Sequence, residues 1–397
     1  MTERDVDICI IGGAGHVGLP LGLVFAAAGQ RVMIYDVNQA ALDTIASGTM
    51  PFIEYGAEPL LTEALATQRL LLSSNPRDIA RAKHVVVAIG TPVDEYLNPK
   101  LRSLLDLFEG IRPYLDPAQV IIIRSTVFPH TCGHVRTSLN RDGHDWLVAY
   151  CPERIAQGYA VRELAELPQL VAGCTDEAAD RAAALFGLIA PKIIRLGVEE
   201  AELAKLFSNA WRYIQFAASN QFYMMAESIG VDFNRVRAAM VQEYGRAASL
   251  PGAGFAAGPC LLKDTMQLAA FNNSSFMLGH AAMSINEGLP NFLVDQLSRR
   301  HKLAGLKVGI LGMAFKADID DIRDSLSYKL GKILRFQGAQ VSYSDEFAQD
   351  PTFITKEQLV ATSDVAIVGV PHSAYKTLAV PAHVEVVDLW NVLPKRT

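Results

Sequence analysis

The chain opens with a glycine pattern that is compatible with few folds. Residues 5–11 form an apolar run that predicts a buried parallel strand, and Gly13, Gly15 and Gly18 follow it directly. Residues 17–28 then predict a helix, and residues 31–36 predict a second strand. Glycines at this spacing permit a tight turn, let the backbone approach a pyrophosphate, and let the helix pack closely on the strand. The pattern therefore predicts a βαβ unit that binds a dinucleotide.

Asp36, at the end of the second predicted strand, bears on which dinucleotide binds. Its carboxylate can bind ribose hydroxyls and would repel a 2′-phosphate, so the sequence favours NAD over NADP. Thr91, Ser125 and Thr126 follow strands predicted at residues 84–89 and 120–124, where strand ends face the ligand in such sheets; alternatively, they only end their strands. The predicted cofactor-binding residues are Gly13, Gly15, His16, Val17, Gly18, Asp36, Thr91, Ser125 and Thr126.

The remainder of the chain predicts an α/β fold in three parts. Strands at residues 146–150 and 170–172 continue an N-terminal Rossmann domain over residues 1–197. Helical periodicity dominates residues 198–300, which would suit a dimer interface or an internal core. Residues 301–397 return to alternation, and they predict a C-terminal Rossmann-like α/β domain with strands at 307–311, 339–343, 365–370 and 384–388.

Composition argues against several classes of function. The 397 residues carry a formal net charge of −6 with scattered basic residues, so nucleic-acid binding is not expected. The N-terminus has neither the charge pattern of a signal peptide nor an apolar run long enough to span a membrane. Five cysteines at irregular spacing, without a CxxC pair, argue against disulfides and against a metal site. We expect a protein of the reducing cytoplasm.

Cys260 is the candidate nucleophile. It shares a short segment with Lys263 and Asp264, directly after a Gly/Ala-rich run. A thiolate can capture an aldehyde, and a nearby cation favours the thiolate form. Taken alone, such a cysteine is more often a small buried residue at a helix start. The dinucleotide pattern in the same chain is what favours the chemical interpretation.

Four further residues are candidates for acid–base or binding roles. Lys205 and Asn209 lie four apart on a predicted helix, where together they could polarise a carbonyl, hold a water or stabilise an oxyanion, or else lie on a solvated face. Glu153 follows a predicted strand and is either a general base or water ligand, or a carboxylate at a helix start. Arg323 either clamps a phosphate or carboxylate or pairs with neighbouring aspartates.

In combination, these motifs resemble the UDP-glucose/GDP-mannose dehydrogenase family of nucleotide-sugar 6-dehydrogenases. The resemblance spans nearly the whole chain, through motifs that begin at Gly13, Gly90, Arg124, Cys151, Ala201, Gly258 and Gly312. It implies that the C6 alcohol of a UDP-sugar is oxidised twice to a carboxylate with consumption of two NAD⁺, in a homodimer formed through the central helices. It also implies that Cys260 attacks the intermediate aldehyde.

The same resemblance implies roles for other residues. It implies that five residues position water, stabilise oxyanions and move protons: Thr126, Glu153, Lys205, Asn209 and Asp264. The implied substrate-binding residues are Glu153, Arg154, Lys205, Asn209, Lys316 and Arg323. There are departures: His16 replaces the usual tyrosine, and Pro259 immediately precedes the nucleophile.

The sequence leaves alternatives open for both the substrate and the reaction. Glu153-Arg154 resembles UDP-N-acetylhexosamine enzymes, whereas residues 158–163 resemble the UDP-glucose pattern; we favour the former. A two-electron β-hydroxyacid dehydrogenase would need neither Cys260 nor a second α/β domain. A catalytically inactive binding protein would be expected to lack part of the set Cys260, Lys205, Asn209 and Asp264, all of which are present.

Overall fold

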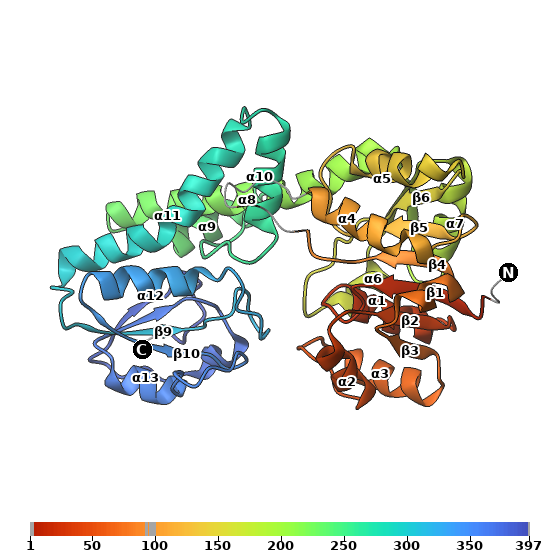
Figure 1. Cartoon of the computed structure of the whole chain (residues 1–397). Helices are drawn as coiled ribbons and strands as arrows, with labels where there is room; N and C mark the ends of the chain where they lie inside the picture. Colours follow the sequence, from red (N-terminus) through yellow and green to blue (C-terminus); the bar gives the residue numbers. More distant parts are fainter. Residues whose placement is uncertain (1–3, 92–93, 95–100, 396–397) are drawn as a thin grey trace. The chain divides into compact units, whose positions relative to one another are not determined.

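The computed structural model describes residues 4–91, 94 and 101–395 and consists of two compact units, Met1–Phe207 and Ser208–Thr397 (Figure 1). The boundary between the units falls between Phe207 and Ser208, within helix α8 (Val198–Ser228). The predicted α/β class, with two sheets and a helical region between them in the sequence, is confirmed. The boundaries predicted near residues 197 and 300 follow the pattern of the sequence and stay predictions.

The first unit is an eight-stranded sheet of order β3-β2-β1-β4-β5-β6-β7-β8. All neighbouring strands are parallel except β6 and β7, which pair antiparallel. Its strands are β1 (Val6–Ile11), β2 (Val32–Tyr35), β3 (Leu70–Ser73), β4 (Ala82–Val87), β5 (Val120–Ile123), β6 (Leu147–Tyr150), β7 (Gln169–Gly173) and β8 (Ile193–Arg195). Its helices are α1 (Gly18–Ala27), α2 (Gln39–Ala46), α3 (Ala57–Ala66), α4 (Leu101–Ile111), α5 (Thr131–Leu139), α6 (Ala160–Glu166) and α7 (Asp176–Phe186).

Successive side chains of each strand point to opposite faces of the sheet, so this unit has two hydrophobic cores. Ile8 and Ile10 of β1 pack with α1, α3 and α7, whereas Cys9 and Ile11 pack with α4 and α5 on the other face. A parallel sheet buried on both faces needs apolar residues throughout its strands, which is why residues 5–11 read as a continuous apolar run. Because β2, β1, β4 and β5 are parallel neighbours, the loops that follow them start at the same edge of the sheet.

The second unit combines helices with a parallel four-stranded sheet of order β10-β9-β11-β12. Its strands are β9 (Lys307–Leu311), β10 (Gln340–Ser344), β11 (Val365–Val368) and β12 (Glu385–Val387). Besides the rest of α8, its helices are α9 (Phe233–Val241), α10 (Leu261–Phe271), α11 (Met277–Arg300), α12 (Leu326–Phe336) and α13 (Lys356–Thr362). Apolar residues of α11 and α12 share one core with β9 and β11.

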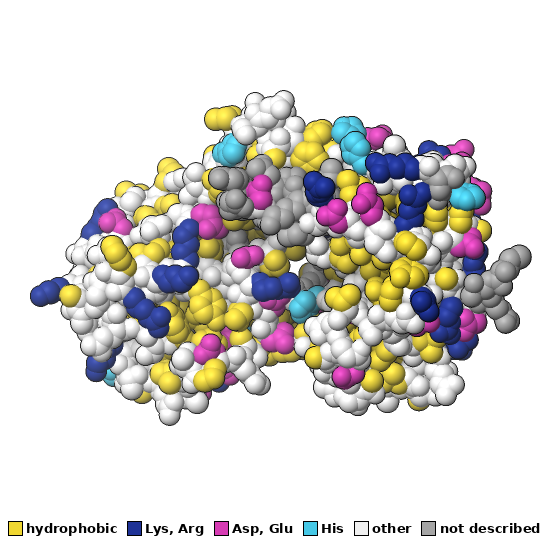
Figure 2. Space-filling model, in the orientation of Figure 1, with side chains coloured by type: hydrophobic (Ala, Val, Ile, Leu, Met, Phe, Trp, Pro, Cys, Tyr) yellow, Lys and Arg dark blue, Asp and Glu magenta, His cyan; other side chains and the backbone are white. Residues whose placement is uncertain are grey.

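The described residues were also compared with what nucleic-acid binding, membrane insertion and metal binding require. On the face in Figure 2, Lys and Arg side chains alternate with Asp and Glu rather than gather into one patch. No helix in the described ranges is long and apolar enough to cross a membrane. Within residues 4–91, 94 and 101–395, no group of three His, Cys, Asp or Glu side chains is arranged to hold a metal ion.

Candidate active site

The glycine loop after β1 is shaped for a ligand as well as for packing. A Cβ at Gly13 would lie 2.6 Å from the Ile10 carbonyl oxygen, and one at Gly18 would lie 2.6 Å from the Gly13 Cα, so packing requires both glycines. At Gly15, however, the nearest atom to an added Cβ would be the Gly12 oxygen at 3.5 Å, an ordinary contact. The protein itself leaves room there, which fits the close approach of a pyrophosphate.

Asp36, just after β2, is oriented by this loop. Its Oδ2 accepts the backbone N–H of Ala14 at 3.0 Å, and its Oδ1 accepts that of Asn38 at 3.0 Å. Each carboxylate oxygen can accept a second hydrogen bond, so a ribose hydroxyl can be added without breaking either contact. The residues present therefore fit NAD.

His16 connects the glycine loop to a second loop. Its ring lies against Phe52 with centroids 3.9 Å apart, and Gln157 Nε2 lies 3.1 Å from His16 Nδ1. Buried Glu54 accepts the N–H of Gly158 at 3.1 Å and so holds the segment that carries Gln157. Val17 precedes α1 and makes no side-chain cap.

The hydroxyl residues at the strand ends have different surroundings. Ser125 Oγ donates to the Ile89 carbonyl at 2.7 Å and thereby ties the end of β5 to the end of β4. Thr126 follows it and is half-buried, as is Thr91. Pro92, in the same predicted motif as Thr91, lies outside the described residues.

Glu153 is held by a cation that the sequence analysis did not single out. Buried Arg124 donates through Nη2 to Glu153 Oε2 and through Nη1 to the Cys151 carbonyl at 3.1 Å. Glu153 Oε1 accepts the N–H groups of Arg154 and Ile155 at 2.7 and 2.9 Å. These contacts fix the orientation of the carboxylate, which suits the positioning of a group better than general-base catalysis.

The Arg154 side chain forms a hydrogen bond within the protein. Its Nη2 donates to the Pro168 carbonyl, and burial lowers the pKa of its guanidinium. The signal that could have indicated Arg124 is its place at the end of a predicted buried strand, where a charge needs a partner.

Lys205 is buried on α8, one turn after Glu202. Glu202 is fully buried and accepts the backbone N–H groups of His130 and Cys132 at 2.7 and 2.9 Å, at the N-terminus of α5. The carboxylate thus satisfies two N–H groups that a helix start leaves open. It fixes the part of α8 that carries Lys205.

Cys260 occupies the N-cap position of α10 in the second unit. It is exposed, whereas Cys9, Cys132 and Cys151 are buried and Cys174 is half-buried; all five cysteines are among the described residues. Burial raises the pKa of the Cys9 and Cys151 thiols to about 12 and that of Cys174 to about 11. A helix N-terminus, in contrast, stabilises a thiolate, so Cys260 has the position that a nucleophile needs.

Asp264 lies one turn after Cys260, and its backbone N–H donates to the Cys260 carbonyl at 2.9 Å. Its buried carboxylate receives a 2.5 Å hydrogen bond on Oδ2 from Asn209 Nδ2. Lys263 Nζ lies 3.6 Å from the other oxygen, Oδ1, which has no hydrogen-bond partner among the described residues. A buried carboxylate oxygen in this state is an acceptor for a water or a substrate hydroxyl.

Arg323 pairs with a neighbouring aspartate, one of the two predicted alternatives. Its Nε lies 3.0 Å from both oxygens of Asp321, and its Nη2 lies 2.5 Å from Oδ2. These hydrogen bonds raise the pKa of the guanidinium, and the charges of Cys260 and Asp324 add to the effect. Its side chain is still 56% exposed. Half-buried Lys316 lies in the loop after β9.

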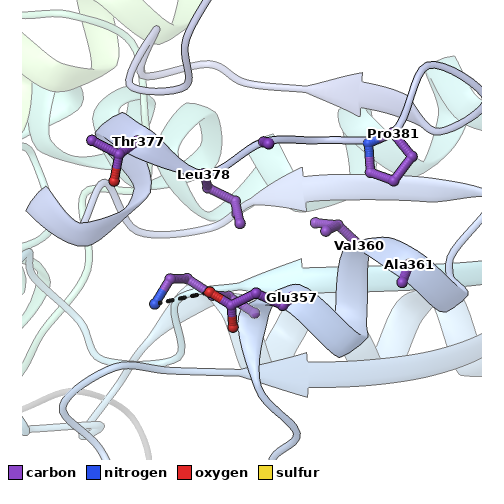
Figure 3. Close-up of a pocket in the computed structure, with 8 residues that line it drawn as sticks. Glu357, Val360, Ala361, Thr377, Leu378 and Pro381 are labelled. Atoms are coloured by element: carbon purple, nitrogen blue, oxygen red, sulfur yellow. Dashed lines mark ion pairs between the residues drawn. The ribbon is translucent and has the colours of Figure 1, made fainter.

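The predicted residues therefore fall into two groups. Those in the first unit are the glycine loop, Asp36, Thr91, Ser125, Thr126, Glu153, Arg154 and Lys205. In the second unit, the structure brings together Asn209, Cys260, Asp264 and Arg323. A separate hollow of about 340 Å³ lies between α13 and the turn at Ser373–Thr377, and Val360, Leu378 and Pro381 line it (Figure 3). No predicted site residue lines this hollow.

Three models of the UDP-glucose/GDP-mannose dehydrogenase family match successive parts of the chain. The NAD binding domain matches residues 6–188, the central domain matches residues 199–288, and the UDP binding domain matches residues 309–395. The chain belongs to this family. It is an NAD-dependent nucleotide-sugar dehydrogenase, as the sequence predicted.

Individual relatives are similar over nearly their full length. The UDP-N-acetyl-D-mannosamine dehydrogenases of Pyrococcus horikoshii and Methanocaldococcus jannaschii are both 27% identical, over 92% and 93% of this chain and 90% and 86% of their own. The solved UDP-D-ManNAc dehydrogenase of P. horikoshii has a TM-score of 0.90 at 26% identity, covering 98% of this chain and 96% of that one. A UDP-glucose dehydrogenase of Pyrobaculum islandicum also has a TM-score of 0.90 at 26% identity, covering 99% and 96%.

Proposed function

We propose that this enzyme oxidises the C6 alcohol of a UDP-N-acetylhexosamine to the carboxylate through a thioester on Cys260. The observation that carries the proposal is the exposed Cys260 at a helix N-terminus, one turn before a buried carboxylate with one oxygen that has no hydrogen-bond partner among the described residues. An oxidation that stops at the aldehyde needs no thiol, whereas one that continues to the acid benefits from a covalent trap.

The steps follow from thiol chemistry. The C6 alcohol first loses a hydride from C6 and its hydroxyl proton to give the aldehyde. The Cys260 thiolate then adds to C6 of the aldehyde, and the carbonyl oxygen takes up a proton to give a thiohemiacetal. Loss of a hydride from C6 and of the hydroxyl proton leaves a thioester. Water attacks the thioester carbon, the C–S bond breaks, and the acid and the thiolate separate. Bound NAD accepts the hydride in each oxidation. In total, the alcohol and one water become a carboxylate, two hydrides and three protons.

The side chains have matching roles in the proposal. Asp264 Oδ1 accepts a proton from the attacking water, while Asn209 donates a hydrogen bond to Oδ2 and Lys263 Nζ lies 3.6 Å from Oδ1. Lys205 supplies a buried ammonium for a developing oxyanion, and Glu153 supplies a fixed carboxylate that positions a polar group. Lys316 and Arg323 contribute substrate contacts, and Thr126 shares in positioning water, stabilising oxyanions or moving protons, as the family resemblance implies.

The sugar is inferred from the relatives. Those with nearly full coverage include several named UDP-N-acetyl-D-mannosamine dehydrogenases, from P. horikoshii and M. jannaschii among others. Glu153-Arg154 agrees with a substrate of that class. UDP-glucose is the second candidate, because the P. islandicum enzyme is equally similar in structure.

The test is the NADH yield per sugar over a panel of UDP-sugars and GDP-mannose. Two NADH per sugar with a UDP-N-acetylhexosamine, and release of the acid, are expected. Cys260→Ser should bind NAD normally but stop at the aldehyde. One NADH per sugar with the unaltered enzyme would indicate a simple alcohol dehydrogenase. No turnover with any sugar would indicate a binding protein.

We also infer a homodimer in a reducing compartment. Trp211, Phe222 and Met225 on α8, with Ile229 just after it, expose apolar side chains at helical spacing, and Val236 and Met240 on α9 do the same. Such a stripe is typical of an interface. An exposed nucleophilic thiol also has to stay reduced to act, which fits the cytoplasm. Sedimentation as a monomer at micromolar concentration would contradict the dimer.

A further inference from the structure

Two buried asparagines lie outside every predicted motif: Asn220 contacts the segment that leads to Cys260, and Asn286 contacts Asn220. Asn220 lies on α8 and Asn286 on α11, and both are fully buried. Buried amides are costly unless each of their polar groups has a partner. Their partners therefore indicate what the two residues hold in place.

The hydrogen bonds of Asn220 and Asn286 determine how the two side-chain amides are oriented. Asn220 Oδ1 accepts the Gly254 N–H at 2.8 Å, and Asn220 Nδ2 donates to the Gly254 carbonyl at 3.0 Å. The same Nδ2 donates to Asn286 Oδ1 at 2.9 Å, and Asn286 Nδ2 donates to the Tyr213 carbonyl at 3.0 Å. Backbone groups at both ends determine which amide atom is which. Asn220 grips Gly254 at two points, and Asn286 orients Asn220.

The segment that Asn220 contacts is also closely packed at two glycines. Gly254 has φ +156°, and a Cβ there would lie 2.2 Å from the Trp390 ring. Gly258 has φ +98°, its N–H donates to the Asp324 carbonyl at 3.3 Å, and a Cβ would lie 2.5 Å from the Phe315 ring. The segment is thus tightly packed at both glycines, and Cys260 lies two residues after Gly258.

Helix α8 holds the Cys260 segment on both sides. Asn220 grips Gly254 before the cysteine, and Asn209, three turns earlier on the same helix, bonds Asp264 after it. A rigid element that contacts both flanks fixes the thiol relative to the carboxylate. Small errors in such placement are costly, since a displacement of about 1 Å can slow a reaction about 100-fold.

We propose that Asn220 and Asn286 are positioning residues that hold the Cys260 thiol ready to capture the aldehyde before it escapes. The inference rests on the proposed function of Cys260. The pair does not touch the thiol. It acts through Gly254 and sets the partition between capture of the aldehyde and its release.

The experiment measures that partition in Asn220→Ala and Asn286→Ala. Released aldehyde is trapped with a hydrazine reagent and compared with the acid formed, and the rate of Cys260 alkylation by iodoacetamide is measured in parallel. We expect the ratio of aldehyde to acid to rise about 10- to 100-fold in Asn220→Ala, and less in Asn286→Ala, which leaves the grip on Gly254. The matched controls Gln221→Ala and Asn291→Ala, at exposed positions on the same two helices, should leave the ratio unchanged.

A structural role alone would lower the amount of folded enzyme without moving this ratio. An unchanged ratio in folded Asn220→Ala and Asn286→Ala would overturn the inference. If Asn220→Ala does not fold, the milder Asn286→Ala decides the matter. Failure of the proposed function is distinguished by Cys260→Ser: if that variant still forms the acid, the thiol is not the trap, whatever the asparagine variants do.

Discussion

Glu202→Gln should destabilise the first unit and slow the enzyme. In the structure, the buried Glu202 carboxylate accepts two backbone N–H groups at the start of α5, at 2.7 and 2.9 Å. Helix α5 has no acidic residue of its own in its first turn, so Glu202 from α8 is the negative charge that meets this helix end. Glutamine has nearly the same shape but keeps only one acceptor and brings an NH₂ group against the second N–H.

The expected loss follows from these contacts. A hydrogen bond to a charged group contributes about 1.5–3 kcal/mol, and an uncharged replacement retains about half of that. One contact weakened and one buried N–H left without an acceptor together cost about 2–4 kcal/mol. For a unit of this size, each kcal/mol corresponds to a melting-temperature shift of about 2–4 °C. Because Lys205 lies one turn further along α8, kcat should fall as well.

Urea denaturation followed by circular dichroism measures the free energy, and steady-state kinetics measure kcat. Glu199→Gln is the matched control: it removes the same charge from an exposed position one turn earlier on α8, and it should change the free energy by less than about 0.5 kcal/mol. If Glu202→Gln behaves like this control, the two hydrogen bonds do not hold α8 against α5, and the reasoning is refuted.

Two further predictions concern the second unit. Burial raises the pKa of Asp345, but hydrogen bonds from His372 and from the Phe347 and Ala348 N–H groups outweigh it and lower the pKa from 3.8 to about 2. The stabilisation, roughly 2 kcal/mol, is therefore present above pH 4 and lost between pH 4 and 2. Acid titration by circular dichroism should show this dependence, and Asp345→Asn should flatten it. Gly258→Ala should lower kcat at least tenfold, because it adds a Cβ against Phe315 at positive φ. A wild-type kcat in folded Gly258→Ala would contradict that account.

Much of the fold could be predicted from the sequence, because buried parallel strands require long apolar runs. The runs at residues 5–11, 120–124 and 307–311 correspond to β1, β5 and β9. The short strands β3 and β8 were not predicted. Leu70–Ser73 and Ile193–Arg195 are too brief to carry a pattern, and they are strands because a neighbouring strand supplies their hydrogen bonds. The antiparallel pairing of β6 with β7 has no signature in the sequence either.

The sequence could predict those parts of the candidate site whose residues are close together in the chain. Cys260 and Asp264 share one turn of helix, so their proximity follows from sequence spacing. The partners that hold the site were not readable, because they come from distant parts of the chain. Arg124 meets Glu153 across the ends of neighbouring strands, and Asn220 meets Gly254 from another helix.

The sequence by itself predicted the glycine loop, NAD as the cofactor and the family, and these are confirmed. The role of Asp36 and the choice of Cys260 as nucleophile stay predictions. All of these depend on local backbone geometry and on residue type. Only the tertiary structure decided that Glu153 is held by a buried cation, that Arg323 pairs with Asp321, and that one buried oxygen of Asp264 has no hydrogen-bond partner among the described residues. The reason is physical. A side chain's charge and orientation depend on which groups burial brings against it, and those groups are set by long-range packing.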